Sequence, residues 1–334
     1  MGQIYMDFGE PVILEDAPSS EDRATLSKIA LQVGVAANQV TPITLASVGT
    51  MILLGYAPRA LTRDELAREI ARVIFWAQAR NIKITSHFEL ENEAELDTLA
   101  DVLVGSRLVT RYDDGPETVY AINPKKEAVA SYYRNTTIHH FVAKAIAELA
   151  LFSATHTDRS RLQAFWAEVD RLRDLFKFEF FYSPTYKFHD EIRAELVRYD
   201  TDWEDRVDQD DDYGIELLRD FRPLIAHATL TQFVEADYVV ADVMAMTPAG
   251  ESLTADECVK RCFGYGRQAY LRRRISSQAS IGKLLFQNGY KWMENKGLTG
   301  ADDASLGQQR KQLSQDLREL THRLHKLQAL ALPA

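Results

Sequence analysis

The sequence contains little cysteine and no recognisable leader. Of its 334 residues only Cys258 and Cys262 are cysteines, too few for a disulfide framework, so we expect a protein of a reducing compartment. Met1 is followed by a strand-like segment and not by a charged and then apolar leader, so no signal peptide is predicted. The chain is long enough for two or three domains with a substantial core.

Charged residues are absent between positions 29 and 58. A membrane-spanning helix would need about 20 predominantly apolar residues in succession. Gln32, Asn38, Gln39 and Pro42 interrupt the apolar run before that length is reached. We therefore predict that this segment is buried helical core and not a membrane span.

Motifs that bind metal ions are missing. Asp208, Asp210 and Asp212 have the spacing that opens a Ca²⁺ loop, but Tyr213 and Arg219 stand where such a loop requires glycine and glutamate. The two cysteines have no further Cys or His nearby to complete a zinc site. We therefore expect no metal ligand.

Nucleotide-binding and catalytic motifs are missing as well. Gly264-Tyr265-Gly266 lacks the third glycine and the preceding strand of a dinucleotide fingerprint, and Gly282-Lys283 lacks the earlier glycine of a phosphate loop. His139 and His140 diverge by about 100° on a helix, so they cannot readily serve one metal or one proton transfer, and one is expected to be a packed core histidine. No catalytic residue and no cofactor are predicted.

The first segment alternates like a β-strand, with Ile4, Met6 and Phe8 on one face. A single strand leaves its backbone groups unpaired and must join a sheet. The next candidate strands are about 70 and 100 residues away and have partners of their own. The segment is therefore expected to be an orphan strand whose sheet lies in a missing upstream domain.

Residues 39–125 are predicted to form a winged-helix-like module. A helix over 43–56 is followed by one that begins at the capping box Thr62 to Glu65, and then by a third with Leu96, Leu99 and Leu103 in register. Residues 108–112 and 117–122 flank Asp113-Asp114-Gly115-Pro116, a hairpin signal.

Nucleic acid is excluded as a partner of this module. A recognition helix needs Lys or Arg against phosphates and bases. Residues 89–101 hold six Asp and Glu and no Lys or Arg, so this surface would repel DNA.

Residues 126–334 are predicted to form a helical C-terminal domain. The last helix repeats leucine from Leu313 to Leu327 at 4-3-4-3 spacing, which predicts packing onto the body of the protein. The acidic stretch 200–212 is expected to be an exposed loop. The other helices are predicted over 136–152, 158–176, 185–199, 214–220, 226–246, 254–274 and 278–290.

Charge is divided unevenly along the chain. Residues 255–334 carry a net charge of +7, whereas the whole chain carries −10 and residues 1–254 therefore carry −17. The densest basic cluster is Arg272-Arg273-Arg274 with Lys283. It predicts contact with an anionic membrane surface, or else an ordinary solvated face.

Several stretches together resemble the C-terminal region of the glycerol-3-phosphate acyltransferase and dihydroxyacetone-phosphate acyltransferase family. The clearest is Tyr132-Tyr133-Arg134-Asn135-Thr136-Thr137-Ile138-His139-His140-Phe141, together with Phe176-Lys177-Phe178-Glu179-Phe180-Phe181. Residues 2–11, 40–60 and 278–298 are similar to further parts of that region, so the resemblance covers nearly the whole chain.

The resemblance implies an acyl transfer from acyl-CoA or acyl-carrier protein to the 1-hydroxyl of glycerol 3-phosphate. In the family a His deprotonates the hydroxyl, and an Asp five positions later orients the imidazole of that His. None of the eight histidines here has such an Asp, and the family's Phe-Pro-Glu-Gly block does not occur. The resemblance thus implies that the catalytic residues lie in a missing upstream domain, through which acyl donors would be reached.

The resulting prediction is a mainly α chain in three parts: 1–38, the tail end of an acyltransferase catalytic domain of α/β type; 39–125, the winged-helix-like module; and 126–334, the helical domain. Its expected role is non-catalytic, in phospholipid biosynthesis, on the cytoplasmic side and peripheral to the cell membrane. A stand-alone helical interaction module without a missing enzyme is the alternative, and an independent enzyme of a new type is a third possibility.

Overall fold

The structure is a computed structural model that describes residues 6–14, 17–85, 93–155, 160–210, 212–248, 250–301 and 304–332. As predicted, it is mainly helical. Its residues divide into two units, the first formed by 1–141 with 181–188 and the second by 142–180 with 189–334. The division into three parts stays a prediction.

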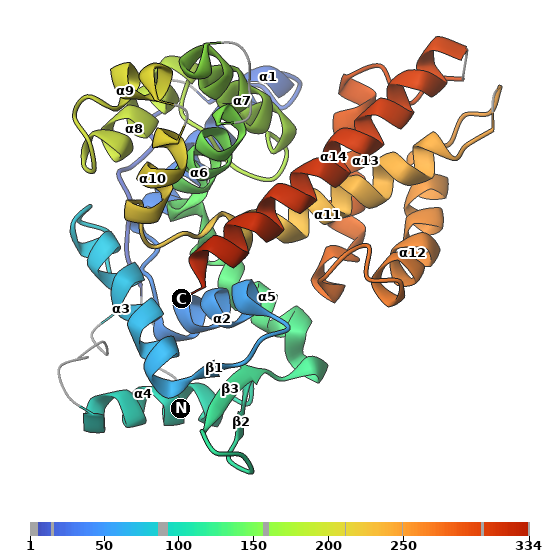
Figure 1. The fold of residues 1–334 in the computed structure, drawn as a ribbon. Helices are drawn as coiled ribbons and strands as arrows, with labels where there is room; N and C mark the ends of the chain where they lie inside the picture. The colour runs from blue at the N-terminus through green and yellow to red at the C-terminus, as the bar shows by residue number, and fades with distance from the viewer. Residues whose placement is uncertain are drawn as a thin grey trace. The chain divides into compact units, whose positions relative to one another are not determined.

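The first unit combines helices with a small antiparallel sheet (Figure 1). Its strands stand in the order β1-β3-β2, so the predicted hairpin β2–β3 forms and β1 pairs with the other edge of β3. The elements are α1 (Arg23–Val40), α2 (Leu45–Tyr56), β1 (Leu61–Thr62), α3 (Arg63–Gln78), α4 (Glu93–Gly105), β2 (Val109–Tyr112), β3 (Val119–Ile122), η1 (Pro124–Lys126), α5 (Glu127–Asn135) and η2 (Ile138–His140).

The predicted start of α3 is confirmed in detail. The Thr62 hydroxyl accepts from the Glu65 N–H, and the Glu65 carboxylate accepts from the Thr62 N–H at 2.9 Å. These bonds satisfy two backbone donors at the helix N-terminus. The predicted apolar face, which includes Leu66 and Ile70, is buried.

The charge-free segment 29–58 behaves differently in its two halves. Helix α2 is almost wholly buried, as predicted, but α1 contains no buried residue. The prediction of core is therefore wrong for α1, because apolar composition favours burial without supplying a surface to bury against. None of the helices that the structure describes is long and apolar enough to cross a membrane.

The second unit is built from packed helices, with residues 185–188 of α8 belonging to the first unit. Its elements are α6 (Val142–Ala154), α7 (Arg161–Leu175), α8 (Thr185–Val197), α9 (Trp203–Gln209), α10 (Tyr213–Asp220), α11 (Ala226–Ala245), α12 (Ala255–Leu271), η3 (Gln278–Ser280), α13 (Lys283–Asn295) and α14 (Ala304–Ala331).

Helix α11 forms the centre of this unit, with α14 running alongside it and α6, α12 and α13 packed around it (Figure 1). The predicted leucine stripe of the last helix supplies the contact: Leu317, Leu320, Leu324 and Leu327 are all at most 1% exposed. The predicted packing of this helix onto the body is confirmed.

Two predicted helices begin later than expected. The helix expected over 136–152 forms as α6 from Val142 onward, so only its predicted start is wrong. Helix α5 ends at Asn135, and the Thr136 hydroxyl then bonds to the Tyr133 carbonyl and competes with helical pairing. The helix expected over 278–290 begins instead at Lys283, after the extended Gly282.

The predicted loop over 200–212 is also wrong. Residues 203–209 form α9, whose Trp203 and Val207 are each 1% exposed. These two apolar residues, four positions apart, bury one face of a helix whose other positions are mostly acidic. Because the acidic side chains dominate the composition, they conceal this short periodicity.

An ion pair is buried beneath the start of α11. The Glu148 carboxylate accepts from the N–H groups of Ile225 and Ala226 at 2.9 and 2.7 Å, and it lies 3.6 Å from the Lys144 ammonium. Lys144 also donates to the Phe221 carbonyl at 2.7 Å. Burial raises the pKa of Glu148 to about 7, against the opposing effect of Lys144. Glu148 thereby caps α11.

Replacing Lys144 with Met should strongly destabilise the second unit. The substitution leaves Glu148 buried without its cation, a situation that costs about 3–5 kcal/mol. Urea unfolding followed by tryptophan fluorescence measures the change. Lys125→Met, on the exposed η1, is the control and should stay within about 0.5 kcal/mol of the wild type. A Lys144→Met loss as small as that of the control would contradict the assignment.

Candidate functional site

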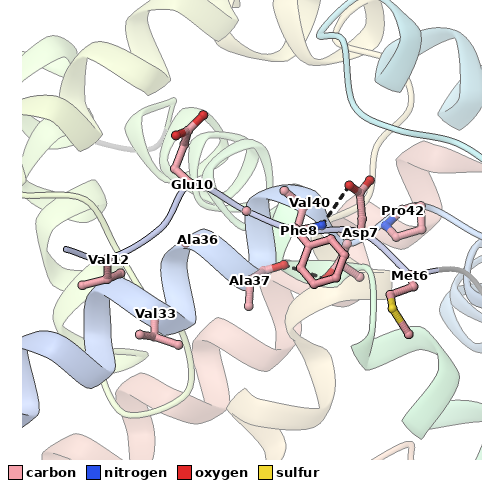
Figure 2. A pocket seen from close by; sticks show the side chains of 12 residues that line it. Met6, Asp7, Phe8, Glu10, Val12, Val33, Ala36, Ala37, Val40 and Pro42 are labelled. Carbon is pink, nitrogen blue, oxygen red and sulfur yellow. Dashed lines mark hydrogen bonds between the residues drawn. The ribbon is translucent and has the colours of Figure 1, made fainter.

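An apolar groove lies between α1 and the N-terminal arm, which we define as residues 6–14 (Figure 2). The groove has a volume of about 650 Å³. Figure 2 shows the arm running alongside the helix, with Val12 and Val33 lining the same groove. The lining residues are Met6, Asp7, Phe8, Gly9, Glu10, Val12, Val33, Ala36, Ala37, Val40, Thr41 and Pro42.

The arm is seated closely on α1. A Cβ atom added at Gly9 would lie 2.9 Å from the carbonyl oxygen of Ala36, so the approach requires glycine. Asp7 forms an ion pair with Lys83, and this hydrogen bond holds the pKa of Asp7 below its ordinary value. No residue from 6 to 14 is in a strand. Residues 1–5 are outside the described part of the chain, so the orphan strand stays a prediction.

The groove carries large apolar side chains into solvent. Among the lining residues, Met6 is 80% exposed, Phe8 is 83% exposed and Val33 of α1 is 51% exposed. Ile13 of the arm, which does not line the groove, is 83% exposed. Apolar side chains that gather on one surface of a folded unit mark a site of interaction. With no charged residue from 29 to 58, the α1 side of the groove suits an apolar partner.

The histidine pair fixes the end of α1. Nε2 of His139 lies 2.7 Å from the Asn38 carbonyl oxygen, and Nε2 of His140 lies 2.8 Å from that of Thr41. A carbonyl only accepts, so each Nε2 carries a proton and donates it. The two histidines thus share a structural task, whereas the sequence predicted only that one of them would pack in the core.

A second motif of the resemblance also contacts α1. A Cβ atom at Gly34 would lie 2.7 Å from the ring of Phe181, so the helix and this ring are in close contact. Both residues belong to the first unit. The histidine pair and Phe181 therefore position α1 from two separate parts of the chain.

The predicted basic cluster lies in the second unit, and its members differ in whether their side chains are already bonded within the protein. Arg272, Arg273 and Lys283 are exposed, and in the part of the chain that the structure describes their side chains have no hydrogen bond or ion pair. Arg274 instead donates to the Tyr265 hydroxyl at 2.9 Å. Arg274 therefore serves partly as an internal contact.

Two further cations, Lys311 and Arg318 of α14, join Arg274 around a small pocket of about 280 Å³. Neither residue was predicted from the sequence to belong to the basic cluster. Their seven-residue spacing puts them on one face of the helix, which is the only feature of the sequence that links them. Their approach to Arg274 is a tertiary contact, so the sequence does not reveal it.

Other groups weighed from the sequence do not assemble. Among the described residues no three His, Cys, Asp or Glu gather in a way that could hold a metal ion. The Sγ atoms of Cys258 and Cys262 are 3.8 Å apart and both residues are buried. His189 bonds to Asp170, across 2.8 Å, on the surface of the second unit.

Comparison with known proteins gives this arrangement a family. The sequence model of the glycerol-3-phosphate acyltransferase C-terminal region matches residues 1–302. The chain therefore belongs to that family.

The individual relatives are acyltransferases by name. The chain is 31% identical over 343 residues to proteins called "Putative acyltransferase plsB1" in Mycobacterium tuberculosis and Mycobacterium bovis, which covers 99% of this chain and 55% of each relative. It is 28% identical over 186 residues to a glycerol-3-phosphate acyltransferase of Shewanella denitrificans, covering 49% of this chain and 22% of that protein. The chain thus spans about half the length, or less, of these curated relatives.

Both histidines should titrate below their ordinary pKa, His139 well below it. Burial and the neighbouring His140 lower the pKa of His139 to about 4, and burial also lowers that of His140. As the pH falls from about 6.5 towards 4, the unfolded chain takes up protons that the folded unit does not, so the first unit should lose stability over that window. NMR titration of the ring protons checks this, and a His139 pKa near 6.5 would contradict the buried arrangement.

Proposed function

We propose that this chain is the C-terminal, non-catalytic part of a glycerol-3-phosphate acyltransferase and that the groove between α1 and the arm receives the catalytic domain. The observation that carries the proposal is a helix without charge from Ile29 onward, none of whose residues is fully buried by the part of the chain that the structure describes. Relatives that are almost twice as long supply the candidate for what covers it.

The chemistry proposed for the complete enzyme needs groups that the described part of this chain does not assemble. A general base must take the proton of the glycerol 3-phosphate 1-hydroxyl as its oxygen attacks the acyl thioester, with the thiol leaving. His139 and His140 both donate from Nε2 to backbone carbonyls, and among the described residues no carboxylate acts on either ring. They are therefore structural, which supports placing the catalysis in another domain.

This chain is then proposed to brace and position that domain. The His139–His140 pair, Phe181 and the Asp7–Lys83 ion pair hold α1 and the arm ready without occupying the groove. Residues 39–125 are proposed to form a winged-helix-like module within this bracing part. Acyl-CoA or acyl-carrier protein would be reached only through the catalytic domain, in phospholipid synthesis at the cytoplasmic side of a membrane, with no role for nucleic acid.

The purified chain should give no lysophosphatidic acid from acyl-CoA and glycerol 3-phosphate. Turnover comparable to that of a complete enzyme would overturn the assignment as non-catalytic. The assay follows radiolabelled glycerol 3-phosphate into lipid, with a complete relative as the positive control.

The groove itself is tested by binding. The part of the M. tuberculosis relative that this chain does not match should bind the chain, and Val33→Asp should weaken that binding at least about tenfold, because it buries an uncompensated carboxylate. Val129→Asp, on an exposed face of α5 in the same unit, is the matched control and should change affinity less than about twofold. Equal effects of the two substitutions would place the interface elsewhere. Failure to bind the catalytic part while capturing another protein would favour the stand-alone interaction module.

A further inference from the structure

The second unit carries a small cationic pocket. It shares no residue with the groove and has no part in the function proposed for the groove. Arg274, three residues after the end of α12, lines a space of about 280 Å³ together with Lys311 and Arg318 of α14. Ser314, Gln315, Tyr238, Ala245 and Asp242 complete the lining. We propose that this pocket binds the phosphate of an anionic phospholipid and so seats the second unit on a membrane surface.

The single carboxylate in the pocket is already engaged. Asp242 accepts from the Tyr265 hydroxyl and, at 2.8 Å, from the Ser314 hydroxyl. Arg274 lies 4.0 Å from it. By contrast, among the described residues the side chains of Lys311 and Arg318 have neither a hydrogen bond nor an ion pair. The pocket therefore keeps two uncompensated cations, and a phosphate oxygen is the acceptor that such groups bind most strongly.

The segment that follows Arg274 in the chain is held in place by a buried carboxylate of α11. Buried Glu235 of α11 accepts from the N–H of Ser276 at 2.6 Å, from the N–H of Ser277 at 3.2 Å and from the Ser280 hydroxyl at 2.6 Å. Arg273, just before this latch, has a left-handed backbone with φ of 54°. The latch therefore sets where the chain leaves α12 and presents Arg272 and Arg273 to solvent.

The exposed leucines that neighbour basic residues in the sequence fit a bilayer better than a small soluble anion. Leu271, directly before Arg272, is 80% exposed, and Leu284, directly after Lys283, is 67% exposed. Isolated leucines beside basic side chains suit the headgroup boundary, where the cations meet phosphate and the leucines meet acyl chains. A soluble phosphate ester would use the cations and leave both leucines in water.

The charge of the rest of the chain restricts the proposed membrane contact to the basic C-terminal residues. Residues 1–254 carry −17, so an anionic membrane repels most of the protein. Residues 255–334 carry +7 and include every cation named for this face. The proposed contact is therefore local and oriented, and not a general attraction between the whole protein and the lipid.

Vesicle sedimentation tests the proposal directly. The intact chain is mixed with vesicles of phosphatidylcholine alone, or of phosphatidylcholine with phosphatidylglycerol, at physiological salt. Binding is expected only with phosphatidylglycerol. Lys311→Gln combined with Arg318→Gln should weaken it about 25-fold, since each cation near such a surface contributes about fivefold. The control, Lys125→Gln with Lys187→Gln, removes two exposed cations of the first unit and should change binding less than twofold.

The other outcomes each count against the proposal. Equal binding to both kinds of vesicle, or to neither, overturns it. A control pair that weakens binding as much as the pocket pair shows unspecific charge attraction. If calorimetry finds inorganic phosphate bound in the pocket while vesicles are ignored, the pocket is a soluble-anion site and the lipid is excluded. Leu271→Asn provides a second variant, outside the pocket, and should weaken vesicle binding without altering any phosphate binding.

Discussion

The first unit depends on how α1 is covered: an apolar helix is stable in water only when other residues cover it, and the arm and Phe181 cover α1 only in part. Its sequence carries no charge from Ile29 to its last residue, yet none of its residues is buried. Several specific contacts in the first unit keep the helix in place, including two hydrogen bonds from histidines to carbonyl groups at its C-terminal end. Such contacts position an apolar surface, and an exposed apolar surface of this kind marks a site of interaction.

The second unit is organised around carboxylates on or beneath α11. Glu148 receives the first N–H groups of the helix, Glu235 holds the segment before α13, and Asp242 joins Tyr265 of α12 to Ser314 of α14. Glu148 and Glu235 are buried and Asp242 is half-buried. A carboxylate removed from water is costly unless its hydrogen bonds are satisfied, so each one specifies which element must lie next to it. The cationic pocket beside Arg274 is a consequence of this arrangement.

Features that depend on neighbouring residues in the sequence could be predicted, and features that depend on distant ones could not. The Thr62–Glu65 capping box and the leucine stripe of α14 are local patterns, and both are found as expected. The exposure of α1 depends on what else is present to cover it, which apolar composition does not reveal. Likewise the basic run at 272–274 is visible in the sequence, whereas Lys311 and Arg318 join it only through tertiary packing.

Hydrogen–deuterium exchange of the intact chain tests the central claim most directly, with and without the part of the M. tuberculosis relative that the chain does not match. We expect the amides of the arm and of α1 to gain protection when that part is added, whereas those of α3 and β3 should change little. Protection that appears elsewhere while α1 and the arm exchange as before would contradict it, because the uncovered helix would then have some other purpose.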